Sequence, residues 1–305
     1  MIEATHWRPY AALIIGVLAV STAAIFIRFA QEEDAPSLLL AAARLTVASL
    51  VLTPIVLHRH RSEVRQLSRE EVRWAAVSGV VLGLHFATWI TSLEYTSVVN
   101  SVVLVATAPL WVAVMAPIVL HERLGKWAIS GLALAVSGGI LVGLSGKAGD
   151  PPTRNIPLLG NSLALIGAVM AAVYFVIGKR LRARISMVVY VWLVYGVAAI
   201  TLVSAVILSG TTVWGLSGKA YLWMLLMGLI PQLIGHSSFN YALGFLPAAY
   251  VSLVVLGEPI GSGILAIIFL SEWPGAWQVV GCGLILVGIL ASSREQQNRE
   301  IELSD

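Results

Sequence analysis

The sequence is poor in charged residues. Only 11% of its 305 residues are Asp, Glu, Lys or Arg, whereas 58% are hydrophobic and the mean hydropathy is +0.87. A soluble domain carries about 25% charged residues and about 45–50% apolar ones. So few charged side chains cannot cover a water-exposed surface. The composition therefore excludes a soluble globular protein and predicts an integral membrane protein.

Cysteine and enzyme motifs are also scarce. The single cysteine, Cys282, lies in an apolar run, which excludes a disulfide framework and a zinc-cysteine site. His121-Glu122 lacks the second histidine of a zinc-protease helix, and neither a Gly-x-Ser-x-Gly elbow nor a phosphate-binding loop with lysine occurs. No small-residue cleavage site follows the first apolar run, so we expect no cleavable signal peptide. We expect no enzyme, no cofactor, no bound metal and no use of ATP.

The sequence is rich in long apolar runs. A bilayer core is crossed by about 20 mostly apolar residues in a helix. Residues 220–257 carry no charge and are too long for one span, so we divide them at Gly244–Pro247, where glycine and proline favour a turn. The sequence thus predicts an all-α integral membrane protein with ten transmembrane helices. They are expected at 10–29, 37–57, 74–93, 97–120, 127–146, 157–178, 186–209, 219–243, 247–270 and 275–293.

The two halves of the chain repeat. A shift of 150 residues pairs Pro109 with Pro259, Glu122 with Glu272, Gly125 with Gly275, Trp127 with Trp277, Gly131 with Gly281 and Gly138 with Gly288. We expect a first repeat of five helices at 1–146, a linker at 147–156 that contains Pro151-Pro152, a second repeat at 157–293 and a cytoplasmic tail at 294–305. Because five is odd, the second repeat is expected to be inverted relative to the first.

The basic residues agree with this topology. The net charge is +3 and the pI is near 9.1, but the basic residues sit in loops between apolar runs, which does not indicate nucleic-acid binding. With both termini in the cytoplasm, fourteen of the nineteen Lys and Arg residues lie inside, four lie outside, and Arg44 lies within a span. This bias is typical of a multi-pass protein of the cell inner membrane.

These features resemble the EamA branch of the drug/metabolite transporter superfamily, over about Tyr10–Ser293. The residues that carry the resemblance are Arg44, Ala108-Pro109-Leu110, Leu120-His121-Glu122-Arg123-Leu124, Glu258-Pro259, Leu270-Ser271-Glu272 and Gly281-Cys282-Gly283-Leu284-Ile285-Leu286-Val287-Gly288. The resemblance implies a central cavity lined mainly by helices 1, 3, 4, 6, 8 and 9. Characterised relatives export amino acids, including aromatic ones, other metabolites and drugs, so no single substrate is implied.

Glu258 is the first candidate for a functional residue, since it falls near the middle of the ninth expected helix. A carboxylate at the bilayer centre is penalised by about 2.5–3.5 kcal/mol on insertion scales. Pro259 follows it and leaves a backbone carbonyl without its helical donor. We interpret Glu258 as a substrate-binding and proton-coupling residue; the alternative is a protonated carboxyl that joins two helices.

Histidines and aromatic residues in mid-span complete the candidate substrate site. His85 shares a helix face with Trp89, and His236 shares one with Asn240. Since histidine titrates near neutral pH, His85 is a second candidate for proton coupling, whereas the alternative for both histidines is a neutral ring that donates to a carbonyl. Trp111 and Tyr174 are candidates because aromatic walls stack on planar substrates or hold cations. A lipid-facing position or plain packing is the alternative for each.

Three charged residues fit structural roles. Arg44 could neutralise Glu258 or an anionic substrate, but we favour an interpretation in which it extends to the outer headgroups. Glu122 and Glu272 each end a fourth helix of a repeat and are expected to pair with loop groups or helix ends.

The sequence therefore predicts a secondary transporter that exports small organic solutes by alternating access, with protons as a candidate coupling ion. A proton-independent facilitator and, less favoured, an intramembrane enzyme are the alternatives. The expected partners are a small-molecule substrate and membrane lipid, with no nucleic acid, and the chain is expected to be a monomer or weak homodimer. Few basic groups lie in mid-span, which disfavours phosphorylated or dicarboxylate solutes.

Overall fold

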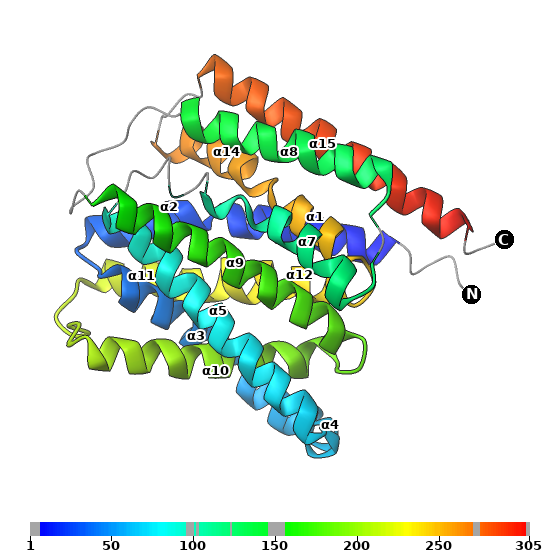
Figure 1. The fold of residues 1–305 in the computed structure, drawn as a ribbon. Coiled ribbons are helices and arrows are strands. Elements are labelled where there is room, and N and C mark those ends of the chain that lie inside the picture. The colour runs from blue at the N-terminus through cyan, green and yellow to red at the C-terminus, as the bar shows by residue number, and fades with distance from the viewer. Residues whose placement is uncertain are drawn as a thin grey trace.

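The chain folds into a bundle of helices (Figure 1). The structure, a computed structural model, describes residues 7–95, 101, 104–122, 124–145, 156–270 and 275–302. Within these ranges it contains helices and no strands. Apolar runs of this length form helices because a helix satisfies its backbone hydrogen bonds internally, where lipid offers no partner. The all-α membrane class predicted from the sequence is confirmed.

Apart from one short helix at Arg61–Gln66, which lies in an expected loop, the helices follow the expected apolar runs. In the first half they are α1 (Trp7–Ser21), α2 (Ala23–Glu32), α3 (Ser37–Arg59), α4 (Arg61–Gln66), α5 (Arg69–Tyr95), α7 (Ala108–Val119) and α8 (Lys126–Ser145). In the second half they are α9 (Pro157–Arg182), α10 (Met187–Leu208), α11 (Gly218–Met227), the π-helix η1 (Gly228–His236), α12 (Ser237–Leu243), α13 (Ala248–Val255), α14 (Glu258–Leu270) and α15 (Ala276–Glu302). The last helix continues to Glu302 rather than ending near residue 293.

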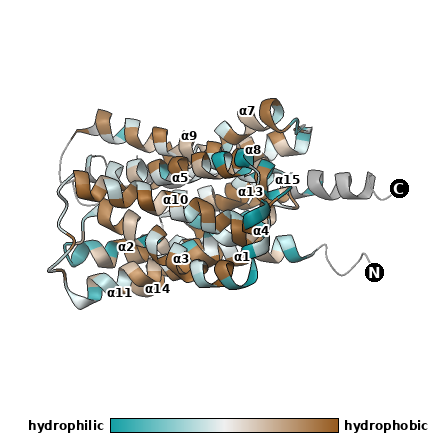
Figure 2. Ribbon diagram, turned by 90° about the horizontal axis from the view of Figure 1, so that it is seen from below, coloured by the Kyte–Doolittle hydropathy of each residue, from teal (hydrophilic) through white to brown (hydrophobic). Residues whose placement is uncertain are grey.

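Seven helices among the described residues are long and apolar enough to cross a membrane. Three further apolar helices, Ala108–Val119, Lys126–Leu141 and Val279–Ser292, are shorter. Figure 2 shows hydrophobic residues along the lengths of the helices and hydrophilic ones gathered toward the ends of the bundle. This distribution is the one that a bilayer requires of a protein that crosses it several times.

Several of the apolar runs are interrupted near their middle. Between α1 and α2 the helix is broken at Thr22, and between α13 and α14 it is broken at Leu256-Gly257. A turn at Ala106-Thr107 likewise precedes α7. Pro259 and Pro109 follow the last two breaks, and proline has no N–H to give to the carbonyl one turn earlier. Proline thus explains why the helix is interrupted at these two places.

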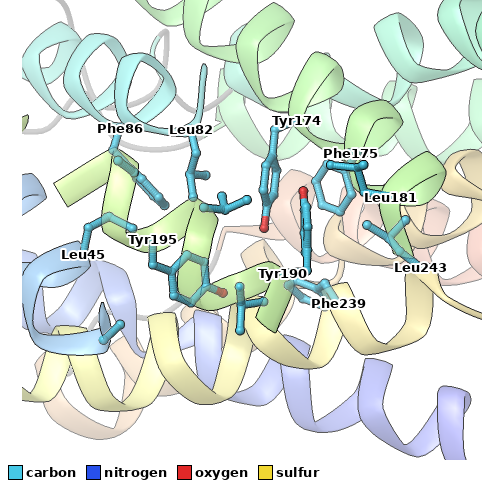
Figure 3. Packing of buried hydrophobic residues seen from close by; sticks show 14 of the residues in the cluster. Leu45, Leu82, Phe86, Tyr174, Phe175, Leu181, Tyr190, Tyr195, Phe239 and Leu243 are labelled. Atoms are coloured by element: carbon cyan, nitrogen blue, oxygen red, sulfur yellow. The ribbon is translucent and has the colours of Figure 1, made fainter. Parts of the chain in front are cut away.

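Two kinds of packing hold the bundle together. Large buried side chains of α5, α9, α10 and α12, including Phe86, Tyr174, Tyr195 and Phe239, fill the interior (Figure 3). At the outer edge, α8 and α15 lie side by side (Figure 1). Their contact consists of glycines: a Cβ atom added at Gly131 would lie 2.5 Å from the carbonyl oxygen of Gly288, and one added at Gly138 would lie 2.5 Å from that of Gly281. Backbones can approach this closely only where side chains are absent.

Candidate functional site

Arg44 of α3 lies at the centre of a polar and aromatic cluster in the bundle interior. Its side chain is 1% exposed, and its Nε donates a 2.6 Å hydrogen bond to Oε1 of Gln232 in η1. The guanidinium lies over the ring of Phe86, 4.3 Å from the ring centroid. The expectation that Arg44 extends to the outer headgroups is wrong, because its side chain is buried, with a hydrogen bond to Gln232 and a cation–π contact with Phe86.

His85 and Trp89 form one wall of this cluster, on α5. Nδ1 of His85 lies 2.9 Å from the carbonyl oxygen of Gly167 in α9. Since a carbonyl can only accept, Nδ1 carries the proton and Nε2 is left as an acceptor. The imidazole stacks on the Trp89 indole, with centroids 5.9 Å apart and planes 14° apart. Nε1 of Trp89 is buried and has no hydrogen-bond partner among the described residues.

His236 and Asn240 extend the cluster along η1 and α12. The His236 ring meets the Phe86 ring edge to face at 5.4 Å, and its Nδ1 is buried without a partner in the described part of the chain. Nδ2 of Asn240 donates to the Tyr174 hydroxyl and to the His236 carbonyl, whereas its Oδ1 has no partner there. The cluster therefore presents several buried polar atoms whose hydrogen-bonding capacity is unused.

Tyrosine hydroxyls surround these groups. The Tyr195 hydroxyl lies 3.2 Å from Oγ of Ser237 and 3.5 Å from the Gln232 carbonyl oxygen. Figure 3 shows Tyr174, Tyr190 and Tyr195 among the apolar side chains of the interior, with their hydroxyl groups between the helices. The interior at this level is therefore polar as well as aromatic.

Two candidates from the sequence are not joined to this cluster by a direct contact. The indole N–H of Trp111 donates to Thr107 Oγ1, one turn earlier in the chain, at 3.3 Å. Glu258 begins α14 and interacts electrostatically with Arg44, but the ion pairs among the described residues do not include these two groups. Of the seven predicted site residues, the structure brings together His85, Trp89, Tyr174, His236 and Asn240.

The two helix breaks meet beside Glu258. Oγ of Ser21, at the end of α1, lies 2.7 Å from the Val17 carbonyl oxygen and 3.3 Å from the Glu258 carbonyl oxygen, so its one proton is shared between the two. Oγ of Ser262 donates to the Ser21 carbonyl at 3.1 Å. Gly261 allows this approach because a side chain there would collide with Ser21. The breaks are thus bonded to each other through side chain to backbone contacts.

Gln232 is the residue that the sequence interpretation overlooked. It is fully buried, and besides binding Arg44 it has an Nε2 group with no partner among the described residues. A signal was available: Gln232, His236 and Asn240 follow one another at intervals of four residues in an otherwise apolar run. Such spacing places polar groups on one helix face.

Outside the spans, two glutamates bind helix starts. Glu122 accepts from the backbone N–H of Ala248, the first residue of α13, at 3.1 and 3.2 Å. Its expected pairing with a helix end is confirmed, whereas Glu272 lies outside the described residues. Glu63 of α4 accepts from the backbone N–H and Oγ of Ser186, each at 2.7 Å, just before α10. Burial alone would raise the pKa of Glu63, but the bonds from Ser186, with His60 nearby, hold that pKa below its ordinary 4.5.

Comparison with known proteins places the chain in a family. The model of the EamA-like transporter family matches residues 7–144 and again residues 158–294. An uncharacterised transporter of Bacillus subtilis, YyaM, is 25% identical over 236 residues, which cover 74% of this chain and 76% of the relative. A probable terminal-alkyne amino-acid exporter of Streptantibioticus cattleyicolor is 27% identical over 206 residues, 66% of each chain.

A solved crystal structure shares the fold, with a TM-score of 0.77 at 21% identity over 95% of this chain and 99% of the other. At that identity the likeness concerns the fold alone. The family matches confirm the resemblance seen in the sequence and favour a transporter over an enzyme. The chain belongs to the EamA-like transporter family and is a multi-pass membrane transporter.

Proposed function

We propose that this protein is a secondary transporter that exports small organic solutes, such as amino acids, aromatic metabolites or drugs, by alternating access. The observation that carries the proposal is a cluster of buried polar atoms that have no hydrogen-bond partner among the described residues, on Trp89, Gln232, His236 and Asn240. Buried polar atoms in folded proteins are nearly always hydrogen-bonded, and a polar group costs most where no water reaches it. Unpaired groups gathered beside aromatic rings are what a binding site for a polar organic solute has to offer.

The proposed architecture is ten spans in two inverted five-helix repeats, with the repeats at 1–146 and 157–293. Three observations support it. The family model matches twice, and the turns at Ala106-Thr107 and Leu256-Gly257 are 150 residues apart, as in the sequence repeat. The glycine contacts are also reciprocal, since Gly131 meets Gly288 while Gly138 meets Gly281. Reciprocal contacts are what a two-fold relation between equivalent surfaces produces.

Inverted repeats favour a substrate site at their junction. The cluster draws Arg44, His85 and Trp89 from the first half, and Gln232 and His236 from the second. A site shared in this way would open to alternate sides if one half rocked against the other, and the broken helices beside Glu258 would supply the hinge. Trp111 and Tyr174 belong to the proposed site as flanking aromatic groups.

We propose proton coupling through Glu258, with His85 as a second candidate. Glu258 interacts electrostatically with Arg44 but forms no ion pair with it among the described residues, which leaves its carboxylate available to a proton. Export is supported by the S. cattleyicolor relative, which is named a probable amino-acid exporter. The proposed location is the inner membrane, with both termini cytoplasmic, as a monomer or weak homodimer.

Transport into proteoliposomes tests this function. The purified protein is given labelled amino acids, aromatic metabolites and cationic drugs, with and without an imposed pH gradient. We expect at least one solute to accumulate against its gradient when protons flow the other way, and Glu258→Gln to abolish the accumulation while leaving downhill exchange. Glu70→Gln is the matched control, because Glu70 forms an exposed ion pair with Arg180 and is not part of the buried cluster around Arg44.

Two results would contradict the proposal at different levels. Transport that ignores the pH gradient and survives Glu258→Gln would favour the proton-independent facilitator. If the folded and inserted protein transports none of the tested solutes, the proposed substrate classes are wrong.

A further inference from the structure

The unpaired polar atoms around Arg44 include donors that face no acceptor among the described residues, whereas Oδ1 of Asn240 is an acceptor and Nδ1 of His236 can be either. Among the described residues, Arg44 donates through Nε to Gln232, and no hydrogen bond from its Nη1 or Nη2 is found there. Nε2 of Gln232 and Nε1 of Trp89 are further buried donors without partners in the described part of the chain. An amide N–H, an indole N–H and the end of a guanidinium donate hydrogen bonds but cannot accept them, so their partner has to be an acceptor.

The geometry of Arg44 suits an oxyanion with two oxygens in reach of its two terminal N–H groups, and a carboxylate is the simplest such group in an organic solute. A guanidinium presents parallel N–H groups that match the two oxygens of a carboxylate. Gln232 holds the Nε edge, and Phe86 covers one face of the guanidinium. These contacts fix the plane of the group and leave its far edge to a ligand. The side chain is therefore oriented in advance, as a recognition site requires.

The charges nearby do not already neutralise Arg44. Glu258 is the carboxylate that interacts with it electrostatically, yet the two form no ion pair among the described residues. His85 and His236, which face the same region, supply no negative charge, and the tyrosine hydroxyls of Tyr174 and Tyr195 are neutral at physiological pH. A fully buried cation without a direct counter-charge is costly in a membrane.

We propose that Arg44 and Gln232 form the subsite that binds the carboxylate of the transported solute. The inference rests on the proposed function and adds to it the residues that select the cargo. Nη1 and Nη2 of Arg44 donate hydrogen bonds to the two carboxylate oxygens, and Nε2 of Gln232 donates to one of the same oxygens. The rest of the solute extends along the stacked rings of His85 and Trp89. The subsite therefore selects solutes with a carboxylate, and simple organic cations should bind more weakly.

Probes that differ only in their charged groups test the subsite. Thermal unfolding of the detergent-solubilised protein is followed while L-phenylalanine, 3-phenylpropionate, L-phenylalanine amide or phenethylamine is titrated. A ligand that binds the folded state raises the unfolding midpoint according to its saturation. We expect the two carboxylates to stabilise the protein and the two compounds without a carboxylate to do so at least about tenfold more weakly.

Three variants separate recognition from mere packing. Arg44→Gln should weaken the binding of L-phenylalanine about ten- to a hundredfold, which is the usual range for the loss of a charge-assisted hydrogen bond. Gln232→Glu, which is nearly isosteric, should raise the midpoint of the ligand-free protein and abolish its response to carboxylates, because the introduced carboxylate occupies Arg44. Thr53→Val is the control on the same helix, since it removes the hydrogen bond from Trp192 and touches no cluster residue.

The outcomes are distinguishable. If the amide and phenethylamine act as strongly as L-phenylalanine, if neither carboxylate acts on the wild type, or if Gln232→Glu responds like the wild type, the subsite is refuted. Gln232→Glu keeps the test informative even if Arg44→Gln fails to fold. Transport of a solute without a carboxylate, unaffected by Gln232→Glu, would leave the proposed transport function standing while removing this inference.

Discussion

Replacement of Gly138 by alanine should separate α8 from α15. The added Cβ would lie 2.5 Å from the Gly281 carbonyl oxygen and 2.9 Å from the Ile285 nitrogen, whereas ordinary contacts are 3.4–4 Å. The helices would have to move apart by about 1 Å, and overpacking of this kind typically costs about 1–3 kcal/mol. At about 2–4 °C per kcal/mol, the unfolding midpoint should fall by several degrees.

Gly139 is the matched control, one residue along the same helix. A Cβ atom there meets its nearest neighbour, the Cβ of Ala106, at 3.9 Å, which is ordinary contact. Alanine is favoured over glycine within a helix by roughly 0.5–1 kcal/mol, so Gly139→Ala should leave the midpoint unchanged or raise it slightly. Two adjacent glycines are therefore expected to respond with opposite signs.

The chain contains its own reporter for this experiment. Cys282, the single cysteine, is half-buried on α15 beside Gly281. A thiol-reactive fluorescent dye will report when α15 leaves α8 during heating. If Gly138→Ala keeps the wild-type midpoint, or if Gly139→Ala lowers it as much as Gly138→Ala does, the close glycine contact is refuted. Gly131→Ala combined with Gly138→Ala should cost less than the sum of the two changes, because the first already separates the helices.

The remaining predictions concern helix starts outside the spans. The hydrogen bonds from Ser186 hold the pKa of Glu63 below 4.5, so ionised Glu63 stabilises the fold above that pH and this contribution should disappear as the pH falls below 4.5. Glu63→Gln should therefore flatten the pH dependence of the unfolding midpoint in that range. An unchanged profile would speak against the contact. Glu122→Ala should lower the midpoint by the equivalent of about 1 kcal/mol, since it removes the acceptor for the Ala248 N–H. Glu122→Gln retains an acceptor and should lower the unfolding midpoint less than Glu122→Ala does. Equal decreases for the two variants would contradict the capping role.

Helix class and approximate limits followed from the sequence because they depend on local hydropathy. A run of about 20 apolar residues has few alternatives to a helix in lipid, and residues 186–209, for instance, correspond to α10 at Met187–Leu208. The prolines also indicated where backbone carbonyls lose their donors. Hydropathy patterns and helix propensities depend on residues that are close together in the chain, so they can be obtained from a single sequence.

The position of Arg44 could not be obtained in this way. Its depth in α3 permits extension to the headgroups, and that interpretation is wrong because Gln232, 188 residues later, supplies an acceptor in the interior. Likewise, the short π-helix η1 has no clear local signal apart from Pro231, although it is η1 that presents Gln232 to Arg44. Contacts between distant segments depend on which helix faces meet, and apolar runs of similar composition do not specify this.

The serine contacts between the two helix breaks have a mechanical consequence. Ser21 bonds to the backbone of Glu258, and Ser262 bonds back to the backbone of Ser21. Each break is therefore also the other's support, and a bend at one displaces the anchor of the other. A change of angle between α1 and α2 would therefore be transmitted to the junction of α13 and α14, and the two broken helices would bend together.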